Sequence, residues 1–167
     1  MVLFPDEFIA SRSLRKTLRN GPYTTRLDSA FGATIRACAA PRLSGPDTWL
    51  NSEMIDSYEQ LHALGFGHSV ETYLADRLVG GLYGIQLGGV FFGESMFSRE
   101  RDASKVALAR LVDECRSRAI QVIDCQVASS HLASLGAREV SRGEFAALLR
   151  RHARRAPRGS WAAAERV

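Results

Sequence analysis

The sequence predicts an α+β or α/β fold in which a central mixed sheet, mostly antiparallel, is flanked by helices. Three observations predict it. Apolar residues recur at helical spacing in several segments along the chain. Residues 68–93 contain three apolar runs separated by tight turns, which is the pattern of an antiparallel meander. After a first basic helix, the predicted elements follow as strand, two helices, three strands, helix, strand and helix.

Length and composition favour one globular domain. A chain of 167 residues with 46% apolar and 24% charged residues is typical of a single soluble domain. We assign the domain to residues 1–155. We expect residues 156–167 to form a flexible tail, because they lack an apolar stripe.

Several classes of protein are disfavoured. No apolar run approaches the roughly 20 residues that cross a bilayer, and the N-terminus lacks the pattern of a secretion signal. We therefore expect a cytoplasmic monomer without membrane contact. An odd number of cysteines without a C-x-x-C pair argues against a disulfide framework and a zinc site, and we expect no metal and no cofactor. The cysteines are Cys38, Cys115 and Cys125.

The first half of the chain is expected to hold three helices and one strand. Gly21 and Pro22 end the first helix, because glycine suits the position after a helix and proline cannot continue one. Asp28 and Asn51 are of the kind that cap helix N-termini. The expected ranges are 8–20, 28–39 and 52–64 for the helices and 23–27 for the strand. The third helix has an apolar stripe of Met54, Tyr58, Leu61 and Leu64.

The second half is expected to hold the meander, a long helix, a further strand and two short helices. Ser141 begins the last helix and forms a capping box with Glu144. The remaining expected ranges are 68–75, 78–87 and 89–93 for the meander, 103–118 for the long helix, 121–127 for the strand and 129–136 for the short helix.

The segment 80–105 is predicted to form the floor of a binding site. Three glycines interrupt its first strand, and glycine inside a strand marks a bulge or a close approach of a ligand or another backbone. Glu94 follows the apolar run at 90–92, where a lone acid is costly to bury without a partner. The partner is either a cation of a ligand or a cation of the chain, Arg99 or Lys105.

Asp124 and Gln126 form a second candidate pair. They are two residues apart on the strand predicted at 121–127, so their side chains should point to the same face. That spacing suits an acid that acts together with an amide. The alternative is that both side chains satisfy buried backbone groups.

Basic residues gather at both ends of the chain, whose net charge is +4. Each group is either a solvated face or a surface for a polyanion. The first group falls at i, i+3, i+4 and i+7 on one face of the first helix and comprises Arg12, Arg15, Lys16 and Arg19. The second comprises Arg142, Arg150, Arg151, Arg154, Arg155 and Arg158.

Five motifs occur in order between residues 80 and 137, within a resemblance that covers residues 9–149: GGLYG, FFGESMFSR, ASK, DCQ and HLASLGA. Together they resemble the leucyl/phenylalanyl-tRNA–protein transferase family, and the motifs at 91–99 and 103–105 are the most specific. The resemblance, with the order of elements, implies an acetyltransferase-like (GNAT) fold. It also implies transfer of Leu or Phe from aminoacyl-tRNA to proteins with N-terminal Arg or Lys, which marks those proteins for degradation by the N-end rule.

The resemblance implies roles for single residues. In acyl transfer from an ester to an amine, Asp124 would orient Gln126, and Glu94 would hold the α-ammonium of the donor. Trp49 would stack on the terminal adenosine, unless it is a core residue. The basic face of the first helix would contact acceptor-stem phosphates. The implied aminoacyl pocket, for which plain core is the alternative, comprises Leu82, Phe91, Gly93, Ser95, Met96, Leu108, Leu111 and Ile123.

The chain also departs from the family. Family members carry an additional N-terminal domain, which we expect to be missing here. They also carry phenylalanine at the positions of Leu111 and Cys115.

A coenzyme A-dependent enzyme is a rival function with the same fold, but residues 98–103 lack the glycines of a pyrophosphate loop. The sequence leaves two further functions open, a related transferase with altered donor or acceptor specificity and a non-catalytic tRNA-binding module.

Overall fold

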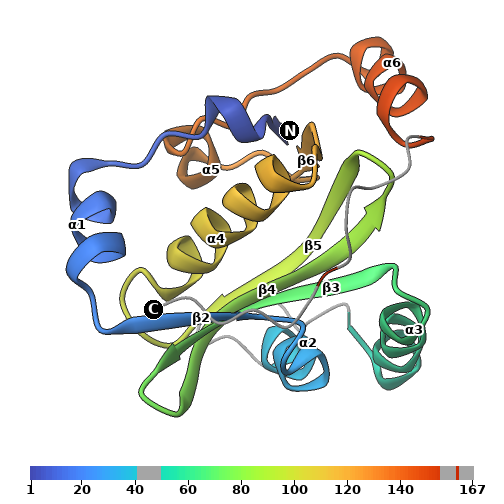
Figure 1. The fold of residues 1–167 in the computed structure, drawn as a ribbon. Helices are drawn as coiled ribbons and strands as arrows, with labels where there is room; N and C mark the ends of the chain where they lie inside the picture. Colours follow the sequence, from blue (N-terminus) through green and yellow to red (C-terminus); the bar gives the residue numbers. More distant parts are fainter. Residues whose placement is uncertain (41–49, 155–160, 162–167) are drawn as a thin grey trace.

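The computed structural model describes residues 1–40, 50–154 and 161, and Figure 1 shows their arrangement. One six-stranded sheet has the order β1-β6-β5-β4-β3-β2. All neighbouring strands are antiparallel except β5 and β6, which are parallel, so the predicted mixed and mostly antiparallel sheet is confirmed. The strands are β1 (Val2–Leu3), β2 (Tyr23–Leu27), β3 (Gly67–Leu74), β4 (Arg77–Leu87), β5 (Val90–Ser98) and β6 (Val122–Asp124).

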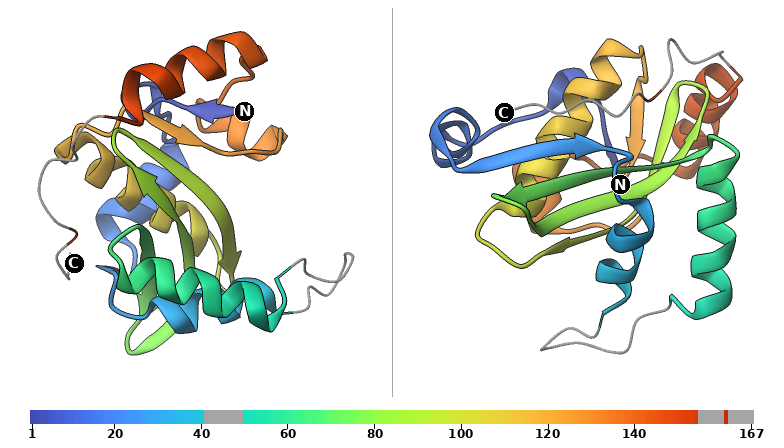
Figure 2. Two further views of the ribbon diagram at one scale, coloured as in Figure 1. Left: turned by 90° about the vertical axis from the view of Figure 1, so that its right-hand side faces the viewer. Right: turned by 60° about the horizontal axis from the view of Figure 1, so that its bottom comes forward.

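Helices lie on both faces of the sheet (Figures 1 and 2). α4 packs along β2 to β5 on one face, and α2 and α3 pack on the other. None of the helices in the described part of the chain has the length and apolar character needed to span a bilayer. The helices are η1 (Pro5–Glu7), α1 (Arg12–Asn20), α2 (Phe31–Ala39), α3 (Ser52–Ala63), α4 (Ala103–Ser117), α5 (Ser130–Ser134) and α6 (Arg142–His152).

Each face of the sheet has its own apolar core. The larger cluster lies between the sheet and α4, where Phe91 and Leu111 are fully buried and Leu14 anchors α1. The cluster beneath α2 and α3 is built around Phe31 and Tyr83. Because burial of one large apolar side chain stabilises by about 1.5–3 kcal/mol, these clusters hold the helices against the sheet.

Side-chain hydrogen bonds at the N-cap position set the first residue of three helices. Asn51 accepts a hydrogen bond from the Met54 N–H at 2.9 Å, and Ser141 forms the predicted capping box with Glu144. Ser11 accepts a hydrogen bond from the Leu14 N–H at 3.1 Å, so α1 begins at residue 12 and not at residue 8 as predicted.

The predicted cap at Asp28 is wrong. α2 begins at Phe31, and its N-cap residue provides no side-chain acceptor. Asp28 has a left-handed φ of 52° and accepts the Ser69 N–H at 2.7 Å, while its second oxygen lies 2.8 Å from His68 Nδ1. A tertiary contact with β3 therefore uses the carboxylate that the local pattern assigns to a helix.

The structure differs from the sequence prediction at four more points. β5 continues to Ser98 instead of ending at residue 93, and β6 ends at Asp124 instead of 127. Leu64, predicted in the buried stripe of α3, is 70% exposed because it lies at the C-cap. β1 was not predicted, since its two residues are too few for a periodic pattern and depend on pairing with β6.

Trp161 packs against the sheet, while the rest of the predicted tail lies outside the described residues. Its indole stacks on the His68 imidazole with ring centroids 4.3 Å apart, and its N–H donates to Gln86 Oε1 at 2.5 Å. The Arg118 guanidinium lies 5.0 Å from the indole centroid. Trp161 thus links β3 and β4 to the end of α4.

Replacement of Trp161 should weaken the fold. Trp161→Ala removes the stack, the hydrogen bond and the guanidinium contact, so we expect the free energy of unfolding to fall by about 2 kcal/mol. Urea unfolding followed by circular dichroism measures this change. Leu64→Ala is the matched control at an exposed site and should have an effect within about 0.5 kcal/mol. Equal losses in the two variants would contradict the linking role of Trp161.

Candidate active site

Glu94 occupies a β-bulge in the pairing of β4 with β5. Tyr83 pairs with Ser95 and Gly84 pairs with Gly93, so Glu94 is the extra residue without a partner on β4. Bulges re-aim side chains and occur often beside active sites. Glu94 is half-buried as a result, with its carboxylate at the side of the sheet that meets α3 and the residues after β6.

Gly84 makes room for this bulge. A Cβ atom at position 84 would lie 2.1 Å from the carbonyl oxygen of Phe92 and 2.5 Å from the Phe91 ring. A contact of that length against backbone cannot be accommodated, so the position requires glycine. The prediction that glycine in this strand marks a bulge and a close backbone approach is confirmed.

β5 and β6 diverge directly beside the bulge. Their last paired residues are Phe92 and Asp124, after which β6 ends while β5 continues to Ser98. In the described sheet, the edge of β5 that faces away from β4 has no strand partner from Gly93 onward. The backbone groups of such an edge are available to a ligand.

The chain turns sharply after β6, and the prediction that Asp124 and Gln126 share a strand face is wrong. Gln126 has a left-handed φ of 57°, which costs a residue with a Cβ roughly 1–2 kcal/mol. The Asp124 carboxylate supports this conformation, because its Oδ1 accepts the Gln126 backbone N–H at 2.9 Å. Asp124 therefore fixes the direction of Gln126 through the backbone.

The turn brings Gln126 onto Glu94. The amide Nε2 of Gln126 donates to Glu94 Oε2 at 3.1 Å, across 32 residues of sequence. This contact joins the two candidate groups of the sequence in one site at the divergence of β5 and β6. Gln126 is exposed and Asp124 is half-buried, so the site is open to solvent.

Tyr58 of α3 belongs to the same site. Burial, the nearby Glu94 charge and a hydrogen bond to Glu94 together raise the pKa of Tyr58 to about 12, so its hydroxyl is neutral at pH 7 and donates to the carboxylate. Behind it, Tyr83 packs edge-on against Tyr58 with ring centroids 5.3 Å apart. The Tyr83 hydroxyl is buried without a hydrogen-bond partner among the described residues.

Neither Arg99 nor Lys105 pairs with Glu94 in the described part of the chain. Lys105 pairs with Asp102 at 2.6 Å, and Arg99 donates to the Leu78 carbonyl and lies over the Phe97 ring. The sequence predicts that Glu94 pairs either with a cation of a ligand or with Arg99 or Lys105. The pairing with Arg99 or Lys105 is not formed. The described residues contain no group of three or more His, Cys, Asp or Glu side chains placed to share a metal ion.

The residues predicted to line an aminoacyl pocket come together on the α4 face. Five are at most 3% exposed and belong to one apolar cluster, with half-buried Met96 packed against it. Gly93 and Ser95 flank Glu94 on β5. The five buried residues are Leu82, Phe91, Leu108, Leu111 and Ile123.

The predicted tRNA contacts lie partly outside the described residues. All four basic residues of α1 are exposed while Leu14 on the opposite side is buried, so the predicted basic face is formed. Trp49 lies outside the described ranges.

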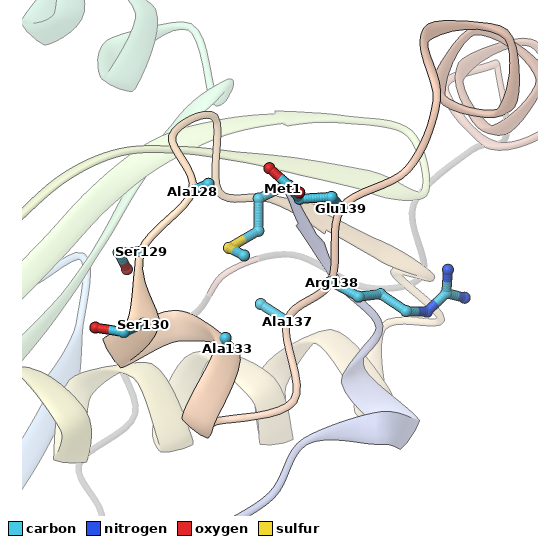
Figure 3. A pocket seen from close by; sticks show the side chains of 8 residues that line it. All are labelled: Met1, Ala128, Ser129, Ser130, Ala133, Ala137, Arg138 and Glu139. Carbon is cyan, nitrogen blue, oxygen red and sulfur yellow. The ribbon is translucent and has the colours of Figure 1, made fainter.

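A pocket of about 420 Å³ lies between α5 and the N-terminal strand (Figure 3). The Met1 side chain points into it, whereas Arg138 points away and pairs with Glu7 at 3.2 Å. The Met1 amino group lies 3.4 Å from the Gln126 carbonyl oxygen, so the pocket adjoins the Gln126 turn. It is lined by Met1, Ala128, Ser129, Ser130, Ala133, Ala137, Arg138 and Glu139, none of which was predicted as a site residue.

The sequence profile of the leucyl/phenylalanyl-tRNA protein transferase family matches residues 2–150. The chain belongs to this family. It is 51% identical to the leucyl/phenylalanyl-tRNA–protein transferase of Chromobacterium violaceum over 92% of this chain and 66% of that protein. It is 54% identical to the transferase of Nitrosospira multiformis over 90% of this chain and 65% of that protein. With that of Stutzerimonas stutzeri it shares 48% identity over 97% of this chain and 72% of the relative.

This member spans about two thirds of the length of the curated relatives that it matches. The family segment contains the bulge at Glu94, the turn at Gln126 and the basic helix α1. Trp161 lies beyond it.

Sequence reasoning missed Tyr58 as a site residue. Its place in the apolar stripe of α3 indicates a core residue, and no local pattern marks its hydroxyl as a donor to a carboxylate on β5. Only the fold brings the two together.

Substitution of Gly84 should disrupt the bulge. Gly84→Ala places a methyl group against the Phe92 carbonyl, so we expect the free energy of unfolding to fall by about 1–3 kcal/mol. Gly143→Ala in α6 is the matched control, because its Cβ would have no neighbour closer than 4.0 Å. It should be neutral or stabilise by up to about 1 kcal/mol. Urea midpoints that move equally would show that the strand pairing tolerates a side chain at position 84.

Proposed function

We propose that this protein is an aminoacyltransferase that moves Leu or Phe from aminoacyl-tRNA to the α-amino group of proteins with N-terminal Arg or Lys. Residues 1–155 act in this proposal as one acetyltransferase-like (GNAT) domain. Family membership supports the proposal. The observation that carries it is the hydrogen bond from Gln126 to Glu94 at the open edge of β5.

The reaction sets clear requirements. The donor is an ester and the acceptor an amine, so the carbonyl is attacked directly and passes through a tetrahedral intermediate. The site must hold both substrates in line, accept a proton from the amine and donate hydrogen bonds to the developing oxyanion. No cofactor takes part in this scheme. In this scheme, backbone N–H groups on the unpaired edge of β5 from Gly93 onward donate to the oxyanion.

Glu94 binds the α-ammonium of the donor in this scheme. Its carboxylate accepts hydrogen bonds from Tyr58 and Gln126, and two carboxylate oxygens have capacity for more. The two existing donors are neutral, so the negative charge stays available to a cation. A charge-assisted hydrogen bond then fixes the aminoacyl group beside β5.

Gln126 positions the acceptor amine. Because its Nε2 is used on Glu94, its Oε1 is the atom left to accept an N–H of the amine. A carboxamide is a weak base, so we assign it positioning and assign Asp124 an electrostatic contribution alongside its support of the Gln126 backbone. Both residues act on the amine without forming a covalent intermediate.

The apolar cluster on the α4 face receives the Leu or Phe side chain. Its six predicted pocket residues lie on β4, β5, α4 and β6, on the face of the sheet opposite the Glu94 carboxylate, so in this proposal the donor side chain reaches them around the open edge of β5. Because five of them are packed as core, the cluster must open when the donor binds. Each methylene contributes about 1 kcal/mol or slightly more to discrimination, so a deep apolar pocket is required to reject small side chains. Trp49 is proposed to stack on the terminal adenosine, and the basic face of α1 to contact acceptor-stem phosphates.

The start of α4 argues against a coenzyme A-dependent reaction. Asp102 lies at its N-cap with a left-handed φ of 61°, and its carboxylate pairs with Lys105. The Ser98 hydroxyl already accepts the Ser104 N–H at 3.2 Å. A pyrophosphate at this helix end would meet an acid and an occupied N–H group.

A transfer assay tests the proposal. Radiolabelled Leu or Phe on tRNA is incubated with the purified chain and a protein with N-terminal Arg, or with the same protein with N-terminal Met. We expect label on the Arg acceptor alone. Absence of label on both acceptors, at concentrations where tRNA is bound, would contradict the proposed activity.

Two substitutions at Asp124 separate its roles. Asp124→Asn keeps an oxygen that can accept the Gln126 N–H, so transfer should stay within about threefold of the parent. Asp124→Ala removes that acceptor and should lower kcat about tenfold or more through misplacement of Gln126. If Asp124→Asn lowers kcat as much as Asp124→Ala does, Asp124 contributes to transfer mainly through its charge and not through its support of the Gln126 turn.

Glu94→Gln tests ammonium binding. It removes the negative charge while keeping a polar side chain, so KM for the aminoacyl-tRNA should rise about tenfold or more, as expected for loss of a charge-assisted bond. Glu139→Gln, at the exposed rim of the pocket in Figure 3, is the control for a lost surface charge. Initial rates over a range of donor concentrations measure both. A KM that is equal in the two variants would remove Glu94 from donor binding.

A further inference from the structure

Cations without partners are confined to two helices of the described chain. On α1 they are the basic face already described, and on α6 with the turn after it they are Arg142, Arg150, Arg151 and Arg154. Exposed cations elsewhere in the described residues have partners: Arg36 pairs with Glu59 at 2.8 Å and Arg77 with Glu100 at 3.4 Å. Arg99 donates to the Leu78 carbonyl and lies over the Phe97 ring. Buried Arg110 and Arg118 share Glu114.

Three of these arginines lie together at the C-terminal end of α6, and we call them the α6 face. Arg150 and Arg151 are neighbours in the last turn of the helix, about 100° apart around its axis, and Arg154 lies in the turn that follows the helix end at His152. All three are exposed. The opposite face of α6 is fixed by packing on buried valines of β1, β5 and β6, through Phe145, Leu148, Leu149 and Ala153.

The α6 face is suited to phosphate and not to an apolar partner. Guanidinium groups bind phosphate oxygens in a bidentate manner, and this face carries three of them with no acid paired to them in the described residues. Protein interfaces and membrane-binding helices need apolar or aromatic anchors. The exposed large apolar residues of the described chain lie elsewhere, at Ile9, Leu18, Leu64, Phe66, Leu87 and Val127.

The two basic helices lie on opposite sides of the candidate active site. In Figure 1, β6 and α5 are placed between α1 and α6. The turn that carries Gln126 connects β6 to α5. An RNA whose 3′ end reaches Gln126 therefore has cationic surfaces to either side of its path.

We propose that the α6 face, Arg150, Arg151 and Arg154, is a second binding surface for the sugar-phosphate backbone of the donor tRNA, on the side of the active site opposite α1. The inference rests on the proposed function, because it takes the donor to be an RNA. The contacts are to phosphates, so they add affinity and orientation without reading sequence.

The test compares two triple variants with equal loss of charge. Arg150→Gln with Arg151→Gln and Arg154→Gln removes the α6 face, and Arg36→Gln with Arg77→Gln and Arg101→Gln removes three exposed arginines elsewhere. Binding of uncharged tRNA is measured by fluorescence anisotropy over a range of roughly 50 to 300 mM salt, chosen around the physiological value. Circular dichroism melting checks that each variant is folded.

We expect the α6 variant to bind about tenfold or more weakly at about 100 mM salt and to lower the salt slope by about 2–3, near 0.9 for each phosphate contact. The control should lose less than about threefold. Equal losses in the two variants, or no loss in either, would overturn the α6 surface. Absence of any salt-dependent tRNA binding by the parent protein would overturn it together with the proposed function.

Binding and transfer separate the two proposals. If the parent transfers the amino acid while the α6 variant binds tRNA as tightly as the parent does, the proposed activity is supported and the α6 surface is contradicted. If the parent binds tRNA through α6 but transfers nothing, the surface stands and the proposed activity falls. Hydroxyl-radical footprinting gives an independent readout, in which the α6 variant should lose one protected stretch of backbone that an α1 variant retains.

Discussion

The site depends on the divergence of β5 and β6 after Phe92 and Asp124. Two parallel strands that stayed paired would satisfy the backbone of β5 and leave no edge for a ligand. Because β6 ends where the bulge at Glu94 begins, the same point of the sheet offers a carboxylate and unpaired backbone groups. The amide of Gln126 is brought there by the left-handed turn that follows.

The surrounding fold keeps that divergence in place. Gly84 allows the bulge, and Asp124 stabilises a backbone conformation that costs Gln126 free energy. α3 contributes a neutral tyrosine that bonds Glu94 without cancelling its charge. On the opposite face, α4 completes the apolar cluster beside the site, and Trp161 links the end of α4 to β3 and β4. The free energy that the left-handed conformation of Gln126 costs is thus offset by packing on both faces of the sheet.

The parts of this fold that local chemistry decides were predictable from the sequence. Examples are the helix caps at Asn51 and Ser141 and the antiparallel meander, which all depend on residues close together in the sequence. The turn at Gln126 was not, because the neighbouring sequence does not mark this non-glycine residue as left-handed and its support comes from the Asp124 carboxylate. Asp28 and Tyr58 were also missed, because each has a partner distant in the sequence, Ser69 and Glu94 respectively, that outweighs its local pattern. The motifs identified the family and named Glu94, Asp124 and Gln126, but only the fold shows how they meet.

In the proposed mechanism, Glu94 and Gln126 together hold an aminoacyl group for attack by an amine. A crystal structure with a non-hydrolysable phenylalanyl-adenosine amide tests it most directly. We expect the α-ammonium within hydrogen-bond distance of the Glu94 carboxylate, the phenyl ring in the apolar cluster of Phe91 and Leu111, and the carbonyl at the β5 edge beside Gln126. An analogue bound away from β5, with the hydrogen bond between Gln126 and Glu94 unchanged and no ligand atom near either side chain, would contradict it.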